Sequence, residues 1–158
     1  MYKRVLVPLD GSPVAEAIVP FLLEIAGPLD MEVVLLRVLQ PLPAATTEVT
    51  SAVSLASVEL LETDAHEYLM PVAAELQGRG VKVETLVRRG DPAREIVHAA
   101  KEAGVDLIAM TTHGRTGFGR LLFGSVAEAV LREAEIPLFL MRQTEAQVRA
   151  RITGTRAR

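Results

Sequence analysis

Apolar residues along the chain follow two alternating patterns. Short runs that are nearly continuously apolar, or alternate with period two, are typical of buried strands, and they cover residues 3–9, 31–39, 81–87, 105–110 and 136–141. Between these runs the apolar residues recur at helical spacing, over about residues 13–26, 51–77, 92–104 and 125–134. Strict alternation of strands and helices predicts an α/β fold with one parallel sheet and helices on both faces.

The ends of the predicted helices carry capping signals. Ser12-Pro13 and Asp91-Pro92 each place a capping side chain before a proline at the first helical position. Ser125-Val126-Ala127-Glu128 matches a capping box. Pro71 lies inside the long helix and cannot donate to the preceding turn, so we expect a kink there.

Five parallel strands with right-handed crossovers form a doubly wound, Rossmann-like sheet. The residues leave two common strand orders open, 3-2-1-4-5 and 2-1-3-4-5. In the first order the winding reverses between strands one and four, and ligands bind at the carboxyl ends of strands where this happens. Those ends carry Pro8-Leu9-Asp10 and Met110-Thr111, so the sequence predicts that they meet in one crevice.

A glycine-containing loop is predicted after the fourth strand. Thr111-Thr112-His113-Gly114 is followed by nine residues and then by Gly124-Ser125, where a helix begins. The unpaired N–H groups and the dipole of a helix N-terminus favour an anion, often a phosphate. Gly114 and Gly124 lack a Cβ, so a ligand could approach the backbone closely.

Composition narrows the function classes. The chain has 158 residues, no cysteine and a net charge of −3. Disulfides and thiolate chemistry are excluded, and a reducing, cytoplasmic location is expected. The three histidines show no metal-ligand spacing, so no metal site is predicted. We find no signal-peptide pattern and no apolar run long enough to span a membrane.

Charge is distributed unevenly along the chain. Five arginines against one glutamate give residues 142–158 a charge of +4, and the preceding body carries −7. An acidic body makes nucleic acid an unexpected partner. We expect residues 143–158 to form a basic, disordered tail.

Several segments occur together in the order of a known family. They are Val5-Leu6-Val7-Pro8-Leu9-Asp10-Gly11-Ser12, Gly90-Asp91-Pro92, residues 106–117, Gly124-Ser125-Val126-Ala127-Glu128 and Ile136-Pro137-Leu138-Phe139-Leu140-Met141. Through them the chain resembles the small universal stress proteins over residues 2–142, which implies a universal stress protein domain over 1–142. The resemblance also implies the strand order 3-2-1-4-5, as in the adenine nucleotide alpha hydrolase-like fold. It implies a homodimer through the fifth strand, 136–141, whose apolar edge invites pairing with a second copy.

Nucleotide-binding members of that family carry Gly, two residues, Gly, nine residues, Gly, then Ser or Thr. The resemblance implies ATP as the ligand, with Mg²⁺ held mostly by phosphates and water. Asp10 would meet the ribose and the Val38 backbone the adenine. The remaining implied site residues are Pro8, Leu9, Met110, Thr111, His113, Gly114, Arg115, Gly124, Ser125 and Val126, of which Gly114, Arg115, Gly124, Ser125 and Val126 would hold the phosphates.

Three points stay open at this stage. Thr111 stands where the family pattern has its first glycine, and it either clashes with the ligand, has no effect, or donates a hydrogen bond. Ser125 either caps its helix alone or also contacts a phosphate. Asp10 either only orders its turn or also binds the ribose.

Three functions follow from these observations. The leading hypothesis is a non-enzymatic, ATP-binding protein of stress response or regulation, because neither a placed base nor an arginine finger is evident. The alternative is a family member that binds no nucleotide and works as a dimeric interaction module, and Thr111 is its main support. The third is a nucleotide hydrolase on the same fold.

Overall fold

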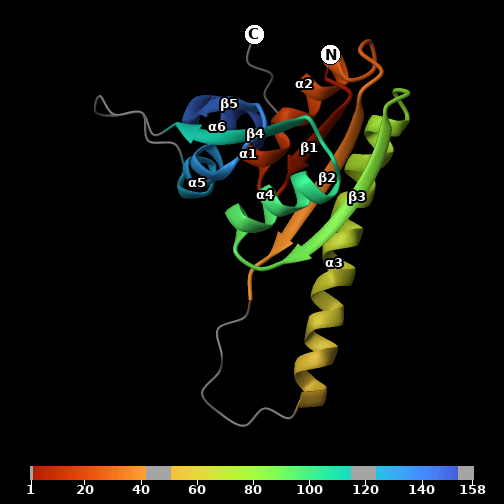
Figure 1. The fold of residues 1–158 in the computed structure, drawn as a ribbon, viewed down its shortest axis with the longest axis vertical. Coiled ribbons are helices and arrows are strands. Elements are labelled where there is room, and N and C mark those ends of the chain that lie inside the picture. The colour runs from red at the N-terminus through yellow and green to blue at the C-terminus, as the bar shows by residue number, and fades with distance from the viewer. Residues whose placement is uncertain (1, 42–50, 115–123, 153–158) are drawn as a thin grey trace.

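A computed structural model describes residues 2–41, 51–114 and 124–152 of the chain. Its sheet has five parallel strands in the order β3-β2-β1-β4-β5, so the first of the two predicted orders is confirmed (Figure 1). The strands are β1 (Arg4–Pro8), β2 (Glu32–Leu39), β3 (Lys82–Arg89), β4 (Leu107–Gly114) and β5 (Leu138–Thr144). The sheet's edges are β3 and β5, as predicted.

Helices cover both faces of the sheet. The helices α2 (Ile18–Ile25) and α3 (Ser51–Gln77) pack on one face, and α4 (Pro92–Glu102) and α5 (Ser125–Glu133) pack on the other. Alternate residues of β1 point to opposite faces, so Val5 and Val7 join the first core and Leu6 joins the second. All three side chains are fully buried, which explains why this strand is apolar throughout.

The first predicted helix is divided in two, which corrects the expectation of one helix to residue 26. A short helix, α1 (Pro13–Glu16), ends before Ala17, and α2 starts at Ile18. The physical reason is Pro20, which has no N–H to donate to the Glu16 carbonyl and whose ring would clash with it. The chain therefore bends at the point that brings α1 next to the carboxyl end of β4.

Strand β4 is longer than the sequence predicted. The expected strand ended at Met110, but pairing with β5 continues from Met110 opposite Leu140 to Gly114 opposite Thr144. The first four residues of the predicted loop are therefore strand, because β5 also extends and supplies partners for their backbone groups. The loop residues 115–123 lie outside the described residues.

The predicted disordered tail is also corrected. Residues 143 and 144 belong to β5, and the helix α6 (Glu145–Ile152) follows directly. This helix lies against α1 and β5, and these tertiary contacts stabilise a segment whose polar sequence gave no strong helical pattern. Residues 153–158 lie outside the described residues.

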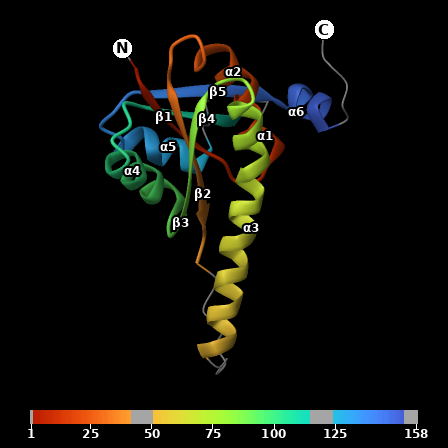
Figure 2. The ribbon, with the colours of Figure 1, turned by 90° about the vertical axis from the view of Figure 1, so that its right-hand side faces the viewer.

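The helix α3 is the longest element of the structure. It begins where the sequence predicted, and it runs through Pro71, whose predicted kink stays a prediction. Leu69 and Leu76 are fully buried against the sheet, whereas Leu55 and Leu60 are exposed. Figure 2 shows the reason: the first half of α3, drawn in yellow, extends beyond the sheet.

Candidate functional site

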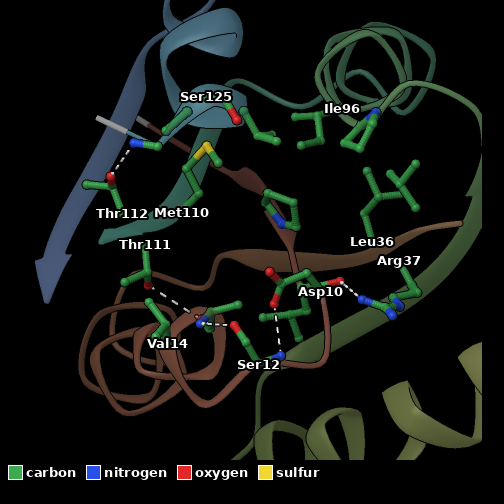
Figure 3. Close-up of a pocket in the computed structure, with 18 of the residues that line it drawn as sticks. Asp10, Ser12, Val14, Leu36, Arg37, Ile96, Met110, Thr111, Thr112 and Ser125 are labelled. Atoms are coloured by element: carbon green, nitrogen blue, oxygen red, sulfur yellow. Dashed lines mark hydrogen bonds between the residues drawn. The ribbon is translucent and has the colours of Figure 1, made fainter. Parts of the chain in front are cut away.

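A crevice of about 560 Å³ opens at the carboxyl ends of β1, β2 and β4. The N-termini of α4 and α5 close its far side. Of the residues predicted for the site, it is lined by Pro8, Leu9, Asp10, Val38, Met110, Thr111, Gly124, Ser125 and Val126. Figure 3 shows Asp10 and Ser12 on one side of this crevice and Met110 and Ser125 on the other. The structure thus brings together residues that are up to 118 positions apart in the sequence.

Two further predicted site residues lie at the end of β4, and their predicted roles in the site stay predictions. His113 and Gly114 follow Thr112 on β4, where they pair with β5. Arg115 lies outside the described residues, so its predicted phosphate contact stays a prediction.

The turn after β1 presents Asp10 to the crevice. The Ser12 N–H donates to Asp10 Oδ1 over 2.8 Å, so this carboxylate does order its turn. The Ser12 hydroxyl oxygen accepts from the Ala15 N–H over 3.2 Å, which confirms Ser12 as the N-cap of α1. Gly11 has a φ of +86°, a conformation that a side chain would strain. The carboxylate of Asp10 remains exposed and available to a ligand.

Thr111 lies at the boundary between the crevice and α1. Its hydroxyl donates to the Ala15 carbonyl oxygen over 3.5 Å, and the side chain is half-buried. Figure 3 shows this side chain directed toward α1, beside Val14. The residue that departs from the family pattern therefore has a protein partner, and it links β4 to the first helix.

The start of α5 differs from the predicted capping box. The N-cap is Gly124, one residue earlier than predicted and without a side chain to make a capping bond, and Ser125 is the first helical residue. The buried Thr112 hydroxyl, on a side chain 5% exposed, accepts from the Gly124 N–H over 3.1 Å and so ties the start of α5 to β4. Ser125 is thus free of the capping role that the sequence suggested, and its exposed side chain lines the crevice.

Gly124 leaves open space at this point. Its φ of −56° is ordinary for any residue, and a Cβ built there would meet no described atom within 4 Å. Neither backbone conformation nor packing against the described residues therefore requires glycine. What remains is the room it leaves beside the first-turn N–H groups of α5, which have no partner within the helix.

Arg37 is a lining residue that sequence reasoning missed. Its Nη1 donates to the Leu9 carbonyl oxygen over 3.5 Å, and its Cζ lies 5.6 Å from the centre of the Tyr68 ring. The signal was present, because Arg37 is the one charged residue in the apolar run from 33 to 39. Partial burial of a cation in such a run is costly unless the cation has partners, so a specific role for Arg37 could have been suspected.

The electrostatics of the described lining are simple. Asp10 and Arg37 are its charged side chains, and two helix N-termini add partial positive charge. At α4, Asp91 accepts from the Arg94 N–H over 3.1 Å, which confirms the predicted cap, and Pro92 and Ile96 form part of the wall. Over the described residues there is no group of three side chains able to hold a metal ion. No helix in that part of the chain is long and apolar enough to cross a membrane.

Fold and site together define a class of protein. This is a small doubly wound α/β protein with a ligand crevice at the switch point of its sheet and a helix N-terminus facing that crevice. The model of the universal stress protein family matches residues 1–142. The chain belongs to the universal stress protein family.

Individual relatives agree with this assignment. The chain is similar to the universal stress protein MJ0531 of Methanocaldococcus jannaschii, with 35% identity over 93% of this chain and 86% of the relative. Among solved structures it is similar to the protein MJ0577, with a TM-score of 0.72, 30% identity, and coverage of 90% of this chain and 97% of that one. A universal stress protein family structure from Burkholderia pseudomallei gives a TM-score of 0.69 and 27% identity, covering 89% of this chain and 96% of that one.

Proposed function

We propose that this protein binds an adenine nucleotide, ATP, in the crevice and acts in stress response or regulation with little or no intrinsic catalysis. The observation that carries the proposal is the convergence of three features on one crevice. These are the exposed Asp10 carboxylate, the end of β2 at Val38, and the open space at Gly124 beside the start of α5.

Each feature suits one part of a nucleotide. A carboxylate accepts hydrogen bonds from sugar hydroxyls. A strand end offers backbone N–H and C=O groups to a base, and a helix N-terminus with unpaired N–H groups favours phosphate. The crevice volume of about 560 Å³ falls within the range of small-molecule sites.

Solved members of the family support an adenine nucleotide. One universal stress protein was solved in complex with cAMP, and a family protein from Arabidopsis thaliana was solved with AMP bound. These two share 19% and 18% identity with this chain, with TM-scores of 0.63 and 0.67, so their similarity to it shows a shared fold. The choice of ATP over other adenine nucleotides is our proposal, as is Mg²⁺ arriving with its phosphates.

The experiment is a calorimetric titration of ATP with Mg²⁺ into the wild type and two glycine variants. Gly124→Val fills the open space beside α5, and we expect it to weaken binding at least roughly tenfold, since a branched side chain would displace the ligand from the N–H groups. Gly27→Val is the matched control. Its Cβ would meet a described atom only at 3.9 Å, which is ordinary contact, and it lies away from the crevice lining. Absence of binding by the wild type, or equal affinity of the wild type and Gly124→Val, would refute the proposal.

A dimeric interaction module without nucleotide is the second candidate, and the observation that favours it is Thr111. Its side chain adds atoms where the family pattern has bare backbone, and it links β4 to α1. If this candidate is right, the wild type releases no nucleotide on denaturation and Thr111→Gly gains ATP binding. If ATP binding is right, Thr111→Gly leaves the affinity within a few-fold of the wild type.

We also propose that the protein is a cytoplasmic homodimer paired through β5. That strand is an edge of the sheet, and its apolar side chains from 138 to 141 are only partly buried in the single chain. Sedimentation equilibrium at micromolar concentration tests the assembly, with about twice the chain mass of 17.1 kDa expected. A monomer mass would contradict it.

A further inference from the structure

We infer that Arg37 is a positioning residue, which together with Tyr68 holds the Asp10 turn in the shape that recognises ligand hydroxyl groups. This inference rests on the proposed function and adds a determinant of ligand specificity to it. Arg37 lies on β2, Tyr68 lies on α3, and the Asp10 turn follows β1. The arrangement therefore joins three segments that meet only in the folded chain.

The guanidinium of Arg37 contacts the turn at two places. Its Nη1 donates to the Leu9 carbonyl oxygen over 3.5 Å. A Cβ built on Gly11 would lie 3.7 Å from both Nη1 and Nη2, so the guanidinium also packs against the middle of the turn. Figure 3 shows Arg37 beside Asp10 and joined to the turn by this hydrogen bond.

Tyr68 also contacts the guanidinium. Its ring centre lies 5.6 Å from Arg37 Cζ, within the range of a cation–π interaction. Its hydroxyl donates to Glu16 Oε1 over 2.9 Å, which anchors the ring to α1. Burial, followed by the hydrogen bond and the negative charge of Glu16, raises the pKa of the Tyr68 hydroxyl, and the Gly11 backbone and Arg37 oppose that shift.

The turn itself transmits this support to the crevice. Asp10 Oδ1 accepts from the Ser12 N–H, so the direction of the carboxylate depends on the backbone of residues 9–12. Gly11, at its φ of +86°, has no side chain to restrict that backbone, so contacts from other elements hold its conformation. Without the guanidinium against it, the turn samples other conformations and the carboxylate no longer has one fixed direction.

Comparing two nucleotides separates the loss of hydroxyl recognition from a general loss of binding. ATP carries both ribose hydroxyls and 2′,3′-dideoxy-ATP carries neither, so the ratio of their dissociation constants measures hydroxyl recognition. We expect the wild type to prefer ATP roughly tenfold or more, because hydrogen bonds to a charged acceptor are the strong ones. In Arg37→Met the ratio should fall to about twofold, with dideoxy-ATP binding nearly unchanged.

Further variants separate positioning from other roles. Arg37→Lys retains a cation without the planar fork and should restore part of the ratio. Tyr68→Phe keeps the ring, loses the Glu16 bond and should lower the ratio less than Arg37→Met. Arg79→Met makes the same change as Arg37→Met at an exposed position of the turn after α3 and should keep the wild-type ratio.

The outcomes distinguish this inference from the proposed function. If Arg37→Met weakens both nucleotides equally, the arginine contacts the ligand directly or acts on stability alone, and the positioning role is wrong. If Gly124→Val weakens ATP binding but the wild type does not discriminate against dideoxy-ATP, the proposed function stands and this inference fails. If the wild type binds neither nucleotide, both are overturned.

Discussion

The hydrogen bond between Thr112 and Gly124 should contribute measurably to stability, and replacing Thr112 by valine tests it. Valine has nearly the same shape, so the change removes the hydroxyl without opening a cavity. The Gly124 N–H then loses the acceptor that lies 3.1 Å away. A buried hydrogen bond contributes about 0.5–1.5 kcal/mol net. Because Gly124 is exposed, water can partly replace the lost acceptor, and we expect a loss of about 1 kcal/mol for Thr112→Val.

The neighbouring residue provides a matched control. Thr111→Val makes the same chemical change one position earlier, where the hydroxyl reaches Ala15 only over 3.5 Å. A hydrogen bond between two neutral groups at that distance is weak, so the loss should stay below about 0.5 kcal/mol. Urea unfolding at fixed pH measures both free energies, and the melting temperature of Thr112→Val should fall by about 2–4 °C. Equal losses in the two variants, or none in Thr112→Val, would refute the idea that this bond stabilises the protein.

Three further predictions concern a helix cap, the core and the response to alkali. Asp91→Ala should lower the free energy of unfolding by about 1 kcal/mol, and Asp91→Asn by much less, because the amide oxygen can still cap α4; equal losses in urea unfolding would contradict this. Leu6→Ala should cost about 2–5 kcal/mol because the side chain is fully buried, whereas Leu60→Ala, 62% exposed, should stay within about 0.5 kcal/mol. Because the pKa of Tyr68 is raised in the folded protein, its hydroxyl ionises first in the unfolded chain as the pH rises. The contribution of the neutral hydroxyl to stability is therefore complete below about pH 10 and is lost as the pH rises above it. Tyr68→Phe should therefore flatten the fall of stability above that pH, and an unchanged slope in unfolding measured from pH 9 to 11 would contradict the assignment.

The sequence by itself determined the class of fold and the ends of most elements. Nearly continuous apolar runs such as 33–36 are typical of strands covered on both faces, and their alternation with helical patterns then predicts parallel pairing. Helix caps could also be predicted where a single side chain makes the capping hydrogen bond, as at Ser12 and Asp91. The family motif further indicated which strand ends would face one another.

Tertiary structure decided what local signals could not. Ser125 and Glu128 fit a capping box, yet the N-cap is Gly124, whose N–H is held by the hydroxyl of Thr112 on β4. Strand β4 runs past its apolar stretch because β5 supplies partners for its backbone, and α6 forms against α1 and β5 where composition predicted a frayed tail. Arg37 acquires its place in the site only when β2, α3 and the Asp10 turn meet. Each of these depends on contacts between residues far apart in the chain, and periodicity and composition carry no information about such contacts.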